Sequence, residues 1–436
     1  MRSRIFRPAL LVALLPTVAW GQEAGGGLAG TWTGIWVRVP DTLAVTMRFE
    51  KAESGWTGTF ESERLRVEGI PFTEVAFHPP DLSLRLVGDA TTTVFAGRVN
   101  GDSLTGTLRE EEEHGSFAFA RAGEIRAGLR EEDVRFRSSG VELAGTLILP
   151  AGTGPHPALV FLHGSGGEGR WASRYLARRF ARAGVAALAW DKRGVGESGG
   201  DWRDAGFEDL AADAAAAIDF LRSRPEIDAG RVGIHGHSQG GTIASLAAVR
   251  SHADFVIGSA AAGVPMADSE EYSVGNFIGL PSLPPEEATI AAAYVEALVA
   301  AAYRGAPREE LETAVARARG HAWFFEPPGP DDAYWQFSRR IADFDPLVWW
   351  RQVQVPVLLV YGALDQRVPV EPSRAAIVAA LESNGKASVT VQVFEDGDHT
   401  FRTRRPGDVW PRTVEGYPGA LIVWLRRSGV VEEPDS

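Results

Sequence analysis

The sequence predicts an α/β protein: a doubly wound, mostly parallel sheet carries a helical insertion and is preceded by a small all-β antiparallel domain. Three observations lead to this fold class. Residues 30–121 alternate apolar with polar side chains in short runs separated by turns. From residue 131 onward, apolar strands alternate with helices, which indicates parallel pairing. Between residues 265 and 345, helical and aromatic-rich sequence interrupts that alternation.

The chain begins with the features of a secretory signal peptide. Met1–Arg7 is basic, Pro8–Trp20 is apolar, and Ala19 and Gly21 supply the small residues of a cleavage site. The apolar run is too short to span a bilayer as a helix. We therefore expect residues 1–21 to be removed by cleavage after Gly21. The mature chain would be periplasmic or secreted and would have no membrane span.

The bulk composition limits the partners of the chain. Its 436 residues carry a formal net charge of -13 and include no cysteine. An acidic surface does not attract nucleic acid or anionic lipid, so neither partner is expected. Without cysteine there can be no disulfide, no lipid attachment through an N-terminal cysteine and no thiol nucleophile. The sequence leaves open whether the protein forms a homo-oligomer.

Residues 30–121 form the expected N-terminal domain. Runs such as Thr31–Val37 and Ala44–Phe49 alternate apolar with polar side chains, and Asn100-Gly101 is a favourable hairpin turn. There is no helical signal in this part of the chain. Eight or nine short strands of this kind indicate an antiparallel meander that forms a small barrel or a strongly curved sheet.

The expected catalytic domain comprises residues 131–264 and 346–430, and the expected cap is the insertion at 265–345. A hairpin over residues 133–149 precedes the apolar strand 158–162. The later strands are expected at 185–190, 231–235, 255–259, 357–360 and 388–394. The helices are expected at 171–183, 207–223, 239–250 and about 372–382, with cap helices at 285–304, 308–319 and 331–341. Most cap aromatics are expected to pack the cap onto the core.

The pattern Gly-x-Ser-x-Gly occurs twice, at Gly236–Gly240 and at Gly196–Gly200. Ser238 directly follows a strand and precedes a helix. A sharp turn there exposes the serine hydroxyl, and the helix N-terminus supplies positive potential. Ser198 instead lies in a glycine-rich loop with no helix start behind it. The local context therefore predicts Ser238 as the nucleophile.

A serine nucleophile needs a histidine base and usually an acid that orients the histidine. Asp365 lies in a turn after strand 357–360, and His399 is the only histidine that follows it. The order serine, acid, histidine and the room for one helix and one strand between the last two fit this role. Asp396 and Asp398 share a loop with His399 and are poorly placed to reach its far nitrogen.

Two backbone N–H groups are expected to form the oxyanion hole. One is the N–H of Gln239, next to the nucleophile. The other is the N–H of Ser165 in the loop His163–Gly167, where Gly164 allows a close approach. The same loop mimics a dinucleotide-binding Gly-x-Gly-x-x-Gly pattern, but it opens with His-Gly and a hairpin precedes its strand. Nucleotide binding is therefore disfavoured, and no cofactor or metal is expected.

Together these motifs resemble the α/β-hydrolase superfamily over about residues 131–430. The resemblance is carried by His163–Gly167, Asp191–Ser198, Gly236–Gly241, Asp365 and His399. Within the superfamily, the chain is similar to bacterial carboxylesterases related to prolyl-oligopeptidase-type and dienelactone hydrolases. Residues 30–121 resemble the β-domain that precedes the catalytic domain in some of those esterases. The resemblance implies activity on carboxylic esters, often with short acyl chains, without a cofactor.

We therefore expect an exported serine carboxylesterase that acts on a small-molecule ester through an acyl-enzyme, with a short to medium acyl chain. A feruloyl, cinnamoyl or other aryl esterase is a close alternative, because the cap aromatics would suit an aryl acid. A prolyl-oligopeptidase-type peptidase is a second, although residues 30–121 are too few for the β-propeller usual there. A rival of another kind is a β-domain that binds polysaccharide or envelope and carries the hydrolase as cargo.

Overall fold

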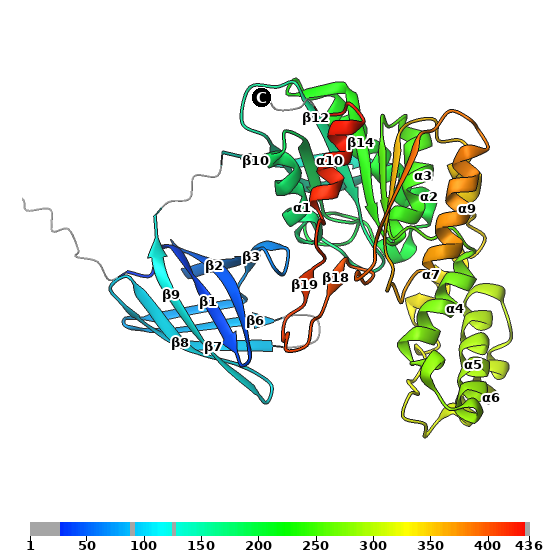
Figure 1. The fold of residues 1–436 in the computed structure, drawn as a ribbon, viewed down its shortest axis with the longest axis horizontal. Helices are drawn as coiled ribbons and strands as arrows, with labels where there is room; N and C mark the ends of the chain where they lie inside the picture. The colour runs from blue at the N-terminus through cyan, green and yellow to red at the C-terminus, as the bar shows by residue number, and fades with distance from the viewer. Residues whose placement is uncertain (1–26, 88–91, 124–127, 432–436) are drawn as a thin grey trace, which may run out of the picture.

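The computed structural model describes residues 27–87, 92–123 and 128–431. The expected signal peptide and its cleavage site lie outside the described residues. Figure 1 shows three parts: an all-β sheet, a large α/β part, and a group of helices on the side away from the all-β sheet. No helix in the described ranges is long and apolar enough to cross a membrane.

The N-terminal part is a strongly curved antiparallel meander, in the order β4-β3-β2-β1-β9-β8-β7-β6-β5. Apolar residues at every second position, such as Leu43, Val45 and Met47, turn inward and build an aromatic-rich core. Strands β3 and β5 also approach each other, so the sheet curls into a half-barrel. The strands are β1 (Gly30–Arg38), β2 (Asp41–Ala52), β3 (Gly55–Ser62), β4 (Val67–Pro71), β5 (Glu74–His78), β6 (Asp81–Val87), β7 (Thr92–Asn100), β8 (Ser103–Glu110) and β9 (Glu113–Ala122).

The larger sheet has the order β10-β11-β13-β12-β14-β15-β16-β17. The first two strands pair antiparallel with each other, and β11 pairs antiparallel with β13; the remaining pairs are parallel. The strands are β10 (Arg130–Ser138), β11 (Val141–Leu149), β12 (His156–Leu162), β13 (Ala186–Trp190), β14 (Ile227–His237), β15 (Val256–Ser259), β16 (Val357–Gly362) and β17 (Val389–Phe394).

Helices cover both faces of this sheet. On β12, Leu159 and Phe161 share a core with α1 (Trp171–Arg182) and α10 (Gly419–Arg427). The alternate residues of the same strand pack on the opposite face, where the helices are α2 (Phe207–Arg222), α3 (Gln239–Ser251), α8 (Pro346–Trp350) and α9 (Val370–Glu382). The predicted fold class, a doubly wound and mostly parallel sheet after an all-β domain, is confirmed.

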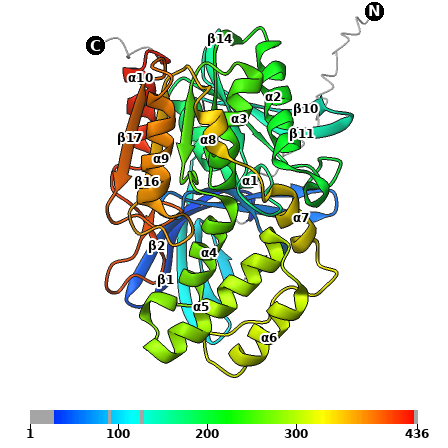
Figure 2. The same ribbon diagram turned by 90° about the vertical axis from the view of Figure 1, so that its right-hand side faces the viewer.

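The helices between β15 and α8 form a cap with its own core, in which Tyr294 and Val295 pack with Leu311. In Figure 2 these helices lie together beneath the α/β part. The sequence did not predict the first of them. The cap elements are α4 (Met266–Phe277), η2 (Leu280–Ser282), α5 (Pro285–Val299), the π-helical turn η3 (Ala300–Arg304), α6 (Arg308–Ala318) and α7 (Ala333–Ile341).

A two-stranded hairpin, β18 (Arg402–Thr403) and β19 (Arg412–Thr413), follows β17. In Figure 1 it extends from the α/β part toward the N-terminal sheet. At the tip of the hairpin, Trp410 packs against the core of the N-terminal sheet. The hairpin therefore connects the two sheets, and it begins three residues after His399.

Candidate active site

Ser238 lies on a sharp turn between β14 and α3. Its backbone has φ 57° and ψ -120°, which is strained for a residue with a side chain. The flanking glycines make the turn possible, because a Cβ on Gly236 would lie 2.2 Å from the carbonyl oxygen of Gly240. A Cβ on Gly240 would lie 2.4 Å from the carbonyl oxygen of Leu162. The turn therefore needs glycine at both positions and leaves the Ser238 side chain at the N-terminus of α3.

The three side chains predicted from separate loops meet at this turn. His399 Nε2 lies 2.9 Å from Ser238 Oγ, and His399 Nδ1 lies 2.8 Å from Asp365 Oδ2. The other Asp365 oxygen accepts the backbone N–H groups of Arg367 and Val368, at 2.7 and 2.9 Å. Since a carboxylate only accepts, Nδ1 of the imidazole carries the proton and Nε2 is free to accept from the serine hydroxyl.

The loop that carries His399 is fixed from within. Asp398 Oδ1 accepts from the backbone N–H groups of Thr400 and Arg402, both at 2.8 Å, so this carboxylate stabilises the turn that contains it. His237 Nε2 lies 2.9 Å from the carbonyl oxygen of His399. Burial, together with the neighbouring His399, lowers the pKa of His237 to about 4. The His237 imidazole is therefore neutral near pH 7 and donates this hydrogen bond.

The loop 163–167 after β12 lies beside the serine. The N–H of Gly164 donates to Glu168 Oε2 at 2.7 Å, so it is engaged within the loop. Burial raises the pKa of Glu168, against the opposing effect of that N–H. Ser165 and Gln239 line the same cavity as Ser238, and among the hydrogen bonds of the described residues none uses their backbone N–H groups. These two donors are free to bind an oxygen in the cavity.

Lys192, which the sequence analysis did not single out, connects the two segments that carry these donors, namely the loop 163–167 and the start of α3. Its ammonium donates to the carbonyl oxygens of Gly164 and Gly166, at 2.9 and 3.0 Å, and to Gln239 Oε1 at 3.0 Å. The side chain is 1% exposed. Burial lowers the pKa of Lys192 to about 8, although the charge of Glu168 acts in the opposite direction. A cation is thus fixed between the loop and the start of α3.

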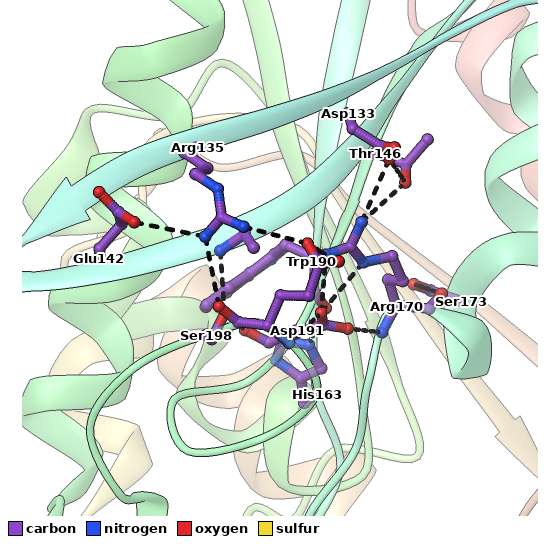
Figure 3. Close-up of polar contacts among 12 residues, drawn as sticks. Asp133, Arg135, Glu142, Thr146, His163, Arg170, Ser173, Trp190, Asp191 and Ser198 are labelled. Atoms are coloured by element: carbon purple, nitrogen blue, oxygen red, sulfur yellow. Dashed lines mark hydrogen bonds and ion pairs between the residues drawn. The ribbon is translucent and has the colours of Figure 1, made fainter.

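The second Gly-x-Ser-x-Gly serine has a different environment, shown in Figure 3. Ser198 Oγ donates to the carbonyl oxygen of Asp191 at 2.6 Å and accepts from the N–H of Ala144 at 2.9 Å. The adjacent carboxylate of Asp191 binds Arg170 through Nη2 at 2.8 Å. The Ser198 hydroxyl is therefore occupied in tying its loop to β11.

A cavity of about 820 Å³ lies between the cap and the α/β part, and Ser238 lines it. Its lining is largely apolar and aromatic, with residues from α4 and α7 that include Met266, Phe277, Phe337 and Ile341. Glu270 of α4 also lines it and accepts from the Tyr334 hydroxyl at 3.2 Å. The volume is in the range of small-molecule sites. Within the described ranges, no three His, Asp or Glu residues are grouped as metal ligands.

The sheet order, the serine on the turn after β14 and the helical cap are those of an α/β hydrolase. A sequence model of the family described as serine aminopeptidase, S33, matches residues 153–403, which is more than half of the chain. The chain therefore belongs to this family.

Similar proteins cover parts of the chain. Esterase EstD of Thermotoga maritima is 24% identical over 266 residues, which are 59% of this chain and 57% of that protein. The quorum-quenching protein AidA of Acinetobacter baumannii is 37% identical over 110 residues, 25% of this chain and 36% of that protein. The chain thus spans less than two thirds of the length of either relative. The structure of the Pyrococcus furiosus esterase Pf2001 is 17% identical with a TM-score of 0.44, and the match covers 70% of this chain and 93% of that one.

Proposed function

We propose that the protein is an exported serine carboxylesterase for small-molecule esters of short to medium acyl chain. One observation carries this proposal: the unbroken chain of hydrogen bonds from Ser238 through His399 to Asp365, with Ser238 and His399 lining a largely apolar cavity. An apolar cavity suits an acyl chain, and a histidine between a hydroxyl and a buried carboxylate suits acyl transfer.

The reaction proceeds in two stages. Ser238 Oγ attacks the ester carbonyl while His399 Nε2 takes its proton, and the imidazolium that forms is stabilised by Asp365. The carbonyl oxygen becomes an oxyanion that binds the N–H groups of Ser165 and Gln239. His399 returns the proton to the leaving alcohol. Water, activated by the same imidazole, then hydrolyses the acyl-enzyme.

The two Gly-x-Ser-x-Gly serines provide a matched test of this mechanism. We expect Ser238→Ala to lower kcat on p-nitrophenyl esters by about 10⁴-fold or more, with an unchanged unfolding midpoint. Ser198→Ala leaves the N–H of Ala144 without its acceptor, so it should lower the free energy of unfolding by about 1–3 kcal/mol and retain near-normal kcat. Substantial turnover by Ser238→Ala would refute the assigned nucleophile.

An aminopeptidase is a second candidate, favoured by the position of one carboxylate. Burial raises the pKa of Glu270 in the cavity, and the hydrogen bond from Tyr334 opposes this. A substrate ammonium beside Glu270 would restore the charged form and be bound by it. An aryl esterase is the third candidate, since Phe277, Phe325 and Phe337 also line the cavity.

A substrate panel separates the three candidates. It comprises p-nitrophenyl esters of increasing acyl length, methyl ferulate and aminoacyl p-nitroanilides. The carboxylesterase proposal expects the p-nitrophenyl esters to give the highest kcat/KM. Cleavage of the anilides alone would replace it with the aminopeptidase, and Glu270→Gln would then raise KM for the anilides. A strong preference for methyl ferulate would favour the aryl esterase.

A further inference from the structure

The N-terminal sheet contacts the α/β part through Glu68 of β4, which pairs with Arg178 and Arg182 of α1, and through the loop at residues 63–66, between β3 and β4. This loop lies against the segment 398–417, which begins with the His399 turn and contains the β18–β19 hairpin. Leu65 offers its carbonyl oxygen to Arg402 Nη2 at 3.1 Å, and Arg64 offers its own to Thr413 Oγ1 at 3.4 Å. The contacts therefore start just beyond His399.

Arg64 anchors the middle of that segment, at the tip of the hairpin. It forms a bidentate pair with Asp41 of the N-terminal sheet, at 2.8 and 2.7 Å. The same guanidinium donates to Asp408 Oδ1 at 3.1 Å and to the carbonyl oxygen of Trp410 at 2.5 Å. Hydrogen bonds from Arg64 keep the pKa of Asp41 well below its usual value, so the pair is ionised at neutral pH. The hairpin is thus fixed to the N-terminal sheet at its tip.

Arg66 acts at the near end, next to His399. Its guanidinium donates to the carbonyl oxygen of Thr400 and lies 5.1 Å from the centre of the Tyr417 ring. The preceding carbonyl, that of His399, accepts from His237. Two consecutive carbonyl groups are therefore fixed by donors from different parts of the chain: one from the turn that carries Ser238, the other from the N-terminal sheet.

The geometry points to a positioning role for the N-terminal sheet: through Arg66 it sets the position of the peptide after His399 and hence the distance from His399 Nε2 to Ser238 Oγ. This inference rests on the proposed function, in which His399 is the base. A base displaced by about 1 Å loses much of its effect on rate, so a contact made outside the substrate cavity can still control kcat. On this view the N-terminal sheet is part of the catalytic apparatus and not a separable binding module.

The test compares variants of two arginines on the N-terminal sheet. Arg66→Met keeps an apolar chain beside Tyr417 but removes every donor, and Arg66→Lys keeps one donor and the charge. Arg98→Met is the matched control, because Arg98 in β7 forms an exposed pair with Asp81 at 3.1 Å, in which both side chains are 71% exposed. The measurements are kcat and KM on a p-nitrophenyl ester, the unfolding midpoint, and the proton NMR signal of His399 Nδ1–H.

We expect kcat to decrease in the order wild type, Arg66→Lys, Arg66→Met. A lost charged donor at a positioning contact predicts a fall of about 10- to 100-fold for Arg66→Met and about three- to tenfold for Arg66→Lys. KM should stay within about twofold, because Arg66 does not line the substrate cavity. Arg98→Met should match the wild type, and the Nδ1–H signal should shift only in the Arg66 variants.

Equal kcat values in the wild type and the folded Arg66 variants would overturn the inference, as would a change confined to KM. If Arg66→Met does not fold, Arg66→Lys decides alone: wild-type kcat refutes the role, and a reduced kcat at normal KM supports it. Failure of the proposed function is recognised separately, by a wild-type protein that cleaves no ester or by an active Ser238→Ala. In that case the Nδ1–H signal, which needs no substrate, still decides whether Arg66 positions His399.

Discussion

Replacing Lys192 with methionine would separate two effects of this buried ammonium: its cost to the free energy of unfolding and its contribution to catalytic activity. The pKa of Lys192 is lowered from the ordinary 10.5 to about 8. At pH 7 this shift corresponds to about 3 kcal/mol of stability lost by burying the ammonium. Methionine removes that cost and fits a similar volume. It also removes three hydrogen bonds, to Gly164, Gly166 and Gln239, which together are worth a similar amount.

We therefore expect the free energy of unfolding of Lys192→Met to lie within about 2 kcal/mol of the wild type. Activity should respond differently. The loop at 163–167 and the start of α3 lose their common partner, so the N–H groups of Ser165 and Gln239 no longer converge on one oxygen. Impairing one such donor costs about 10²- to 10³-fold in kcat, and we expect a loss of that size.

The assay measures kcat on a p-nitrophenyl ester and urea unfolding of the same preparations. The control is Lys386→Met, since Lys386 is an exposed lysine whose ammonium donates to Gln354 Oε1 at 3.3 Å. Equal activity in Lys192→Met and Lys386→Met would refute the positioning of the donors by Lys192. A loss of activity that merely follows a large loss of stability would refute it as well.

The pH dependence of kcat and of stability provides a second test of the role of Lys192. A neutral amine has two protons for three acceptors, so kcat of the wild type should fall as pH rises through about 8. Stability has the opposite sign, because a lysine whose folded pKa is depressed binds its proton more tightly in the unfolded chain. The difference in unfolding free energy between the wild type and Lys192→Met should therefore change in favour of the wild type between pH 8 and 10.5.

Two further predictions concern other parts of the chain. Asp213, whose side chain is fully buried, binds Arg193 through two hydrogen bonds of 2.7 and 2.6 Å. Asp213→Ala leaves the Arg193 guanidinium buried without its partner and should lower the free energy of unfolding by about 3–5 kcal/mol. The double replacement Arg193→Met with Asp213→Leu should recover most of that loss, as measured by urea titration. N-terminal sequencing of the protein recovered outside the cytoplasm should begin at Gln22; a sequence that begins at Met1 would contradict signal-peptide cleavage.

The close approach of Ser238, Asp365 and His399 was predictable because each lies at or just beyond the end of a parallel strand. The carboxyl ends of such strands share one edge of the sheet, so chain order alone brings their loops together. Lys192 could not be predicted in the same way. A lysine after a strand is normally solvated, and its burial here depends on the loop 163–167 and on Gln239, which are distant in sequence.

Elements that depend on tertiary contacts were also missed. Helix α4 contains Ser269, Ser273, Val274 and Gly275, which are weak helix formers, so its sequence gives little local signal. The helix is tied to the site through Tyr272, whose hydroxyl donates to the carbonyl oxygen of Asp365 at 2.8 Å. The β18–β19 hairpin pairs only two residues in each strand and gains its order from the N-terminal sheet. In the sequence, Arg64 and Arg66 are simply charges in a turn.

The hairpin at residues 402–413 also has a consequence for the order in which the protein matures. Arg64 and the carbonyl of Trp410 that it binds are 346 residues apart in the chain. Chains are made from the N-terminus and domains generally fold as units, so the N-terminal sheet can form long before its docking partner exists. Until then the ionic contact surface around Asp41 and Arg64 stays hydrated, and docking waits until residues 402–413 have been made. A product truncated before Trp410 would keep a folded first sheet with an open docking surface, which proteases and chaperones could distinguish from the finished enzyme.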